Sequence, residues 1–209
     1  MATVSDNKSI IFDLDGTIWN SIIYRIKAWQ LAFKDYGIDT DPEVIRLMIG
    51  YPGSMLIKKM NARDPAIEKR EEMYFEKMLP DVKFYPDVEY TFSWLKKMGF
   101  KIAIVTSSRR NMIEKINVHA DAIVTMDDVQ KGKPDPEPYE KAIKIMEGTP
   151  ERTIVVGDID NDLIPAKLLG CVAILVLHGT LKQSEHKDYE ISEIEDIINI
   201  IKTLNWIIK

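Results

Sequence analysis

The chain has 209 residues, of which 45% are hydrophobic and 29% are charged, as in ordinary globular proteins. This length allows one sizeable core, or a core domain with a smaller insert. A formal net charge of −5 and the lack of a strongly basic stretch disfavour a nucleic-acid partner. No apolar run reaches the length of a membrane span, and the N-terminus shows no apolar signal region. We therefore expect a cytoplasmic protein with no membrane association.

Short apolar runs recur along the chain, separated by segments with a helical pattern. The first run, residues 10–12, is continuously apolar, which predicts a strand buried on both faces of a sheet. Further strands are predicted over residues 101–105, 122–125, 153–156, 172–177 and 189–191. Helices are predicted over residues 22–33, 42–49, 54–61, 65–79, 88–98, 109–116, 139–146, 163–169 and 193–204. Such alternation predicts an α/β fold: a doubly wound parallel sheet with helices on both faces.

One long stretch interrupts this alternation. Residues 21–84 show helical patterns and no convincing strand, and they are too numerous for a loop. We therefore predict an inserted small α-helical cap domain over residues 21–84. Residues 1–20 and 85–209 would then form the α/β core domain.

Polar side chains stand where several predicted strands end. Asp13 and Asp15 follow the first strand and point the same way, because side chains alternate along extended chain. Thr106 follows the second strand, Asp158 follows the fourth, and Lys133 lies in a proline-rich loop. Because all strands of a parallel sheet end at one edge, where ligands bind in such folds, we expect these groups to converge.

These residue types suit the transfer of a phosphoryl group. The carboxylates of Asp13, Asp15 and Asp158 are hard oxygen ligands of the kind that Mg²⁺ prefers. Lys133 and Thr106 are donors for a phosphate dianion, as are amides at helix N-termini. A carboxylate beside the metal can also attack phosphorus, as in aspartyl-phosphate chemistry. We therefore predict a site in which positioning and charge neutralisation supply most of the catalysis.

Four short motifs carry a resemblance to a known family. They are D-L-D-G-T at 13–17, T-S at 106–107, K-P at 133–134 and G-D-x-x-x-D at 157–162. In order and spacing they resemble the four motifs of the haloacid dehalogenase superfamily, and the resemblance covers nearly the whole chain. The position of the helical insert resembles the branch of phosphoglycolate phosphatase and β-phosphoglucomutase. The resemblance implies a Rossmann-like core with a small helical cap.

The resemblance also implies catalytic roles. Asp13 would be the nucleophile that forms an aspartyl-phosphate, and Lys133 would neutralise it and the phosphoryl oxygens. Asp15 would protonate the leaving alcohol and then activate the hydrolytic water. Thr106 would hydrogen-bond the phosphate.

Metal and substrate contacts follow by the same resemblance. The implied cofactor is Mg²⁺, held by Asp13, by the backbone carbonyl of Asp15 and by Asp158. Asp162 would bind the ion directly or contact the groups that bind it. Substrate contacts are expected from Gly16, Thr17, Ser107 and Arg109.

The resulting hypothesis is a Mg²⁺-dependent phosphatase that hydrolyses a small phosphorylated metabolite. The carboxylate of Asp15 disfavours a dehalogenase, which releases halide and has no alkoxide to protonate. The turn at residues 50–53 lacks the arginine that phosphoglucomutases carry near that point, which favours a hydrolase over a mutase. A β-phosphoglucomutase-type phosphomutase, a phosphonatase with a cap lysine and a non-catalytic phosphate-binding module stay as alternatives.

Some questions have no answer in the sequence. Arg25 and Tyr51 of the predicted cap could face the substrate, and a place on the protein surface fits them at least as well. The identity of the substrate and the choice between a monomer and a homodimer also stay open.

Overall fold

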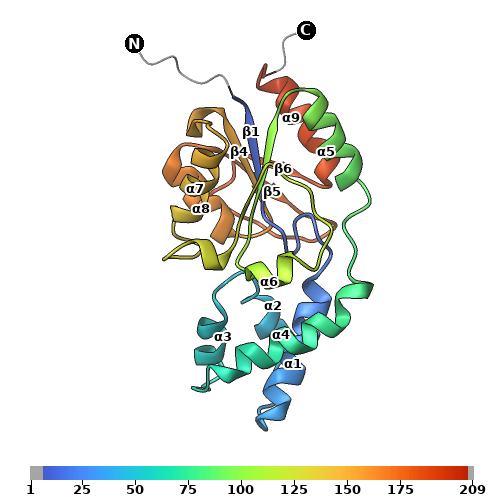
Figure 1. Ribbon diagram of the computed structural model, residues 1–209, viewed down its shortest axis with the longest axis vertical. Coiled ribbons are helices and arrows are strands. Elements are labelled where there is room, and N and C mark those ends of the chain that lie inside the picture. The colour runs from blue at the N-terminus through green and yellow to red at the C-terminus, as the bar shows by residue number, and fades with distance from the viewer. Residues whose placement is uncertain (1–6, 207–209) are drawn as a thin grey trace.

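The computed structural model describes residues 7–206, and a six-stranded sheet lies at its centre (Figure 1). All neighbouring strands are parallel, in the order β3-β2-β1-β4-β5-β6. The strands are β1 (Ser9–Phe12), β2 (Lys101–Val105), β3 (Ala122–Val124), β4 (Thr153–Gly157), β5 (Val172–Val176) and β6 (Tyr189–Ile191). This order has the central switch of a doubly wound sheet and confirms the predicted fold class.

Both faces of the sheet are covered by helices, as continuous apolar strands require. Ile10 and Phe12 of β1 point to one face, where α5 (Val88–Lys97) and α9 (Ile197–Thr203) pack. Ile11 points to the opposite face, in the apolar cluster with α7 (Glu137–Ile145) and α8 (Asp160–Leu169). Figure 1 shows these two pairs of helices on opposite sides of the sheet.

A second group of helices lies beyond the carboxyl ends of the strands (Figure 1). We call it the helical group; it consists of α1 (Ile22–Asp35), α2 (Pro42–Arg46), α3 (Gly53–Lys59) and α4 (Ala66–Met78). It has an apolar cluster of its own, built around Trp29, Phe33, Ile45 and Leu56. The expectation that residues 21–84 form helices without a strand is confirmed, and their standing as a separate domain stays a prediction.

Several helix boundaries differ from the predicted ones. Helix α8 begins at Asp160 instead of residue 163, so Asp162 lies in its first turn, where carboxylates oppose the positive end of the helix dipole. Helix α6 (Arg110–Ile113) is shorter than predicted. Short 3₁₀ turns cover Leu79–Asp81, Met126–Asp128, Pro150–Arg152 and Ile194–Asp196. None of the helices within residues 7–206 has the length and apolarity to cross a membrane.

Candidate active site

The strand register brings the predicted polar groups to one edge of the sheet. Phe12 pairs with Ile104 on one side and with Val156 on the other, so these three strands end almost level. The backbone N–H of Asp13 still donates to the carbonyl of Val156, at 2.9 Å, which fixes the position of the carboxylate. The predicted convergence of groups at the strand ends is therefore present.

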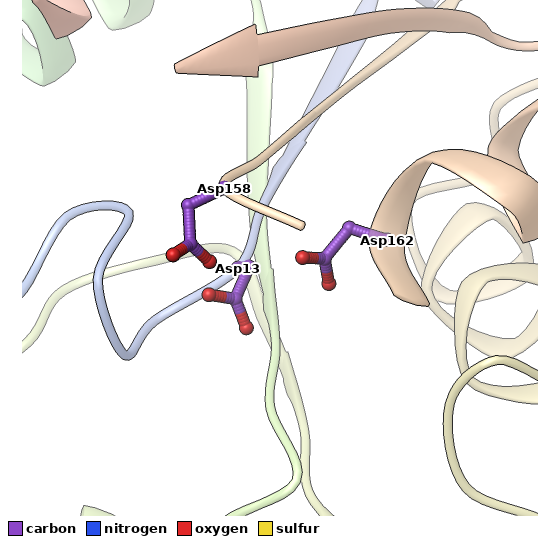
Figure 2. Close-up of side chains that lie close together, drawn as sticks. All are labelled: Asp13, Asp158 and Asp162. Carbon is purple, nitrogen blue, oxygen red and sulfur yellow. The ribbon is translucent and has the colours of Figure 1, made fainter. Parts of the chain in front are cut away.

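Three buried aspartates meet at this edge (Figure 2). Asp13 follows β1, Asp158 follows β4, and Asp162 reaches toward them from α8; one oxygen of each lies within 4.8 Å of the others. Burial raises the pKa values of Asp13 and Asp158, and repulsion from Asp162 adds to both shifts. Oδ2 of Asp162 is buried and has no hydrogen-bond partner among the described residues. Carboxylates this close are stabilised by a cation placed between them.

Lys133 already supplies one positive charge to this cluster. Its Nζ lies 2.6 Å from Oδ1 of Asp13 and 2.7 Å from Oδ1 of Asp162, and its side chain is 3% exposed. Burial alone would lower the pKa of Lys133, but the two carboxylates outweigh it and raise the pKa above the usual value. Tyr139 of α7 donates its hydroxyl to the same oxygen of Asp162, at 2.8 Å. Lys133 is therefore positioned to neutralise charge on Asp13, as the sequence predicts.

The carboxylate of Asp15 turns away from this cluster and toward the helical group. Oδ1 accepts from Ser21 Oγ at 2.7 Å and from Arg25 Nε at 3.1 Å, and Oδ2 accepts from Ser108 Oγ at 3.1 Å. Burial acts to raise the pKa of Asp15, but the guanidinium and the two hydroxyls outweigh it and hold the pKa below its usual value. The predicted metal contact through the backbone carbonyl of Asp15 stays a prediction.

Arg25 and Glu71 form a second buried group beside Asp15. Arg25 has only 12% of its side chain exposed, donates from Nη1 to Glu71 at 3.2 Å, and lies over the ring of Phe75 at 3.7 Å. Burial raises the pKa of Glu71 to about 7, against the pull of Arg25. The structure thus places Arg25 at the site rather than on the surface. No sequence signal singles out Glu71, because it lies in a Glu- and Lys-rich helix of the kind that is usually solvated.

A cavity of about 280 Å³ lies between the strand ends and the helical group. The aspartate cluster, Asp15 and Lys133 line it from the sheet side. Arg25 and Tyr51 line it from the helical group, together with Trp29 and Leu56. Both residues whose place the sequence left open therefore face the cavity. Its lining combines apolar side chains with charged groups from both the sheet edge and the helical group, as in a site for a small polar molecule.

The residues predicted to bind substrate divide into two sets. Ser107 and Arg109 line the cavity, whereas Gly16 and Thr17 are not part of its lining. The hydroxyl of Thr17 instead donates to Oδ2 of Asp13 at 3.0 Å, which orients that carboxylate. Gly16 has φ +85°, and a Cβ there would lie 2.7 Å from Oδ2 of Asp158, so a side chain would disturb the cluster.

Thr106 also lies behind the cavity wall. Its Oγ1 accepts the backbone N–H of Ser108 at 3.0 Å, and only 4% of the residue is exposed. The contact with phosphate predicted for Thr106 stays a prediction.

Comparison with known proteins agrees with this geometry. The sequence model of the haloacid dehalogenase-like hydrolases matches residues 10–176. The chain is 30% identical to a phosphoglycolate phosphatase of Aquifex aeolicus, covering 92% of this chain and 95% of that protein. It is 30% identical to the pyrophosphatase PpaX of Bacillus mycoides, with 94% and 98% covered. It is 29% identical to a glyceraldehyde 3-phosphate phosphatase of Methanocaldococcus jannaschii, with 94% and 98% covered.

Solved structures share the fold. A hydrolase from Pseudomonas syringae superposes with a TM-score of 0.84 at 22% identity, over 95% of this chain and 99% of that one. Since the family match spans most of the chain, including the strands that carry the aspartates, the chain belongs to the haloacid dehalogenase-like hydrolase family.

Proposed function

We propose that this chain is a Mg²⁺-dependent phosphatase that hydrolyses a small phosphorylated metabolite through an aspartyl-phosphate. The observation that carries the proposal is the buried carboxylate of Asp13, held by Lys133 at 2.6 Å and facing a cavity beside two further aspartates. Relatives named as phosphatases and a pyrophosphatase support the same class of reaction.

The aspartate cluster fits a hard divalent cation. It offers only carboxylate oxygens, and one of them, Oδ2 of Asp162, is buried without a hydrogen-bond partner among the described residues. Mg²⁺ prefers such ligands and keeps sites for water and phosphate oxygens. When bound by Asp13 and Asp158, it would offset the charge of the carboxylates and of the phosphoryl group.

The chain's own residues would then carry the proton and phosphoryl transfers. An oxygen of Asp13 attacks phosphorus and the bond to the leaving oxygen breaks, while Asp15 donates a proton to that oxygen. Asp15 next takes a proton from water, which attacks the phosphorus, releases phosphate and restores Asp13. The Arg25 contact holds the pKa of Asp15 below its usual value, which favours the ionised form that acts as the base in the second step and disfavours the protonated form that the first step uses. Lys133 balances the negative charge on Asp13 and the phosphoryl oxygens in both steps.

We further propose that residues 21–84 act as a cap domain on a core of residues 1–20 and 85–209. The carbonyl of Gly50 accepts from Ser107 Oγ and from Asn161 Nδ2, each at 3.2 Å, so the helical group touches the core at the cavity rim. A cap that closes over the cavity would exclude water during the first transfer.

The test is phosphate release from a panel of small phosphate monoesters, with and without Mg²⁺. We expect metal-dependent release that falls by about 10³ or more in Asp13→Asn. Asp39→Asn, at an exposed position between α1 and α2, is the matched control and should keep full activity. If no ester releases phosphate, the proposal is wrong. Retention of an aspartyl-phosphate that rephosphorylates the product would favour a phosphomutase, and ester binding without turnover a binding module.

A further inference from the structure

One face of helix α4 forms an acidic wall of the cavity. Glu68, Glu71 and Glu72 are spaced by three and four residues, which puts them on one side of a helix. All three line the cavity. They lie on the helical group, opposite the strand ends that carry the proposed phosphoryl-transfer groups. This wall therefore faces the part of a substrate that is not transferred.

The cations of the cavity are already engaged. Among the described residues that line it, three are cationic, and each contacts two carboxylates. The pairs are Lys133 with Asp13 and Asp162, Arg25 with Asp15 and Glu71, and Arg109 with Glu72 and Asp127. A second anionic group on a substrate would therefore find no cation without breaking an existing ion pair.

Glu68 is the carboxylate of this wall that lacks such a partner. Among the described residues it forms no ion pair; its carboxylate lies beside the backbone of Gly53, and the charge of Arg109 acts on it only from beyond ion-pair distance. A Cβ on Gly53 would lie 2.5 Å from Oε1 of Glu68, so the carboxylate lies directly against the backbone at the start of α3. Burial raises the pKa of Glu68. Its remaining lone pairs can accept hydrogen bonds from a ligand, and its charge repels an anion.

We propose that the leaving group of the substrate carries no negative charge and donates hydrogen bonds to the acidic wall of α4. The proposal rests on the phosphatase function proposed above and narrows its substrate class to phosphate monoesters of uncharged or cationic alcohols. Like charges brought together in a binding site suppress the wrong partner, because no counter-ion or water compensates them fully. The acidic wall therefore disfavours 2-phosphoglycolate, whose leaving group keeps a carboxylate.

Three esters of matched size test the sign of the leaving-group charge. They are 2-phosphoglycolate, 2-hydroxyethyl phosphate and 2-aminoethyl phosphate, whose leaving groups are anionic, neutral and cationic. We expect kcat/KM for the neutral and cationic esters to exceed that for 2-phosphoglycolate by about tenfold or more. Equal or faster hydrolysis of 2-phosphoglycolate would overturn the proposal while leaving the phosphatase function intact.

The ratio of two kcat/KM values in one variant cancels any general loss of activity or folding. Glu68→Gln keeps the shape of the side chain and removes its charge, so the preference for the neutral over the anionic ester should shrink about threefold or more. Glu76→Gln is the matched control, since Glu76 lies on the same helix, contacts Lys115 and does not line the cavity. An unchanged ratio in Glu68→Gln would contradict the assignment of this wall.

Absence of turnover would be informative as well. If none of the three esters releases phosphate, the phosphatase function fails for them. Calorimetric titration of Asp13→Asn in the presence of Mg²⁺ then compares the Kd values of the same three esters. Tighter binding of 2-hydroxyethyl phosphate than of 2-phosphoglycolate supports the acidic-wall inference. The reverse order overturns it.

Discussion

Arg25 and Asp15 form a buried ion pair that joins the helical group to the strand edge, with Nε 3.1 Å from Oδ1. The same guanidinium also contacts Glu71, so one cation serves two buried carboxylates. Removing one partner of a buried ion pair leaves uncompensated charge and is strongly destabilising.

We therefore expect Arg25→Met to lower the free energy of unfolding by about 3 kcal/mol, even though methionine can still pack on Phe75. Urea denaturation at pH 7 measures this difference. Arg46→Met is the control, because Arg46 pairs with Glu43 on an exposed surface of the helical group and should change stability by less than about 0.5 kcal/mol. Equal effects of the two variants would show that the Arg25 ion pairs contribute no more to the free energy of unfolding than an exposed pair does.

Glu71 should make stability depend on pH. Burial raises its pKa from 4.5 to about 7, so the folded chain keeps a proton where the unfolded chain has lost it. Glu71 therefore contributes to the free energy of unfolding through its bound proton. This contribution is fully present below pH 4.5 and is lost as the pH rises to about 7. Glu71→Gln lacks this titration, so its stability relative to the native chain should rise by about 2 kcal/mol between pH 5 and pH 8. Denaturation curves at several pH values measure the difference, and a constant difference would contradict the raised pKa.

Lys182 should compete with a metal ion for Asp158. It lies between β5 and β6, and its ammonium contacts Oδ2 of Asp158, one of the three clustered aspartates. We expect Lys182→Met to tighten Mg²⁺ binding by about tenfold, because the ion no longer displaces a resident positive charge. Calorimetric titration measures the Kd. Lys187→Met, which removes a contact to Glu190 in the same segment, should leave the Kd unchanged.

Gly50 should control the contact between the helical group and the core. Its φ is +93°, and a Cβ there would lie 2.5 Å from Cδ1 of Ile159, so alanine is strained and crowded at the cavity rim. We expect Gly50→Ala to move the carbonyl away from Ser107 and Asn161 and to lower kcat/KM by about tenfold. Gly37→Ala is the control, since Gly37 has φ +69° but open space around it. It should lower stability and leave kcat/KM close to that of the native chain.

Much of the fold and part of the site follow from local sequence signals. Apolar runs mark the strands, and the rule that parallel strands end at one edge predicts that Asp13, Lys133 and Asp158 converge. The structure places these groups together. This succeeds because each position depends on its own strand or loop and on the strand order, which is common to doubly wound sheets.

The remainder depends on packing between helices that are distant in sequence. Arg25 lies on α1 and Glu71 on α4, and the contact between these two helices brings the two side chains together. The direction of the Asp15 carboxylate depends on Ser21, Arg25 and Ser108, which come from distant parts of the chain. The early start of α8 comes from its acidic first turn, which a pattern of apolar residues does not reveal. The local sequence pattern of a charged residue predicts an exposed side chain, because it does not reveal that another helix will cover it.

The three glutamates of α4 have a consequence for how such a protein can be redesigned. The groups proposed to transfer phosphate stand at strand ends, whereas Glu68 and Glu72 stand on one helix that contributes none of them. Exchanging these two acids for lysine or for small neutral residues would alter which ligand binds. The residues proposed to transfer phosphate would keep their positions at the strand ends. Recognition and reaction are thus divided between separate residues: Glu68 and Glu72 can change, whereas Glu71 pairs with Arg25, which contacts Asp15.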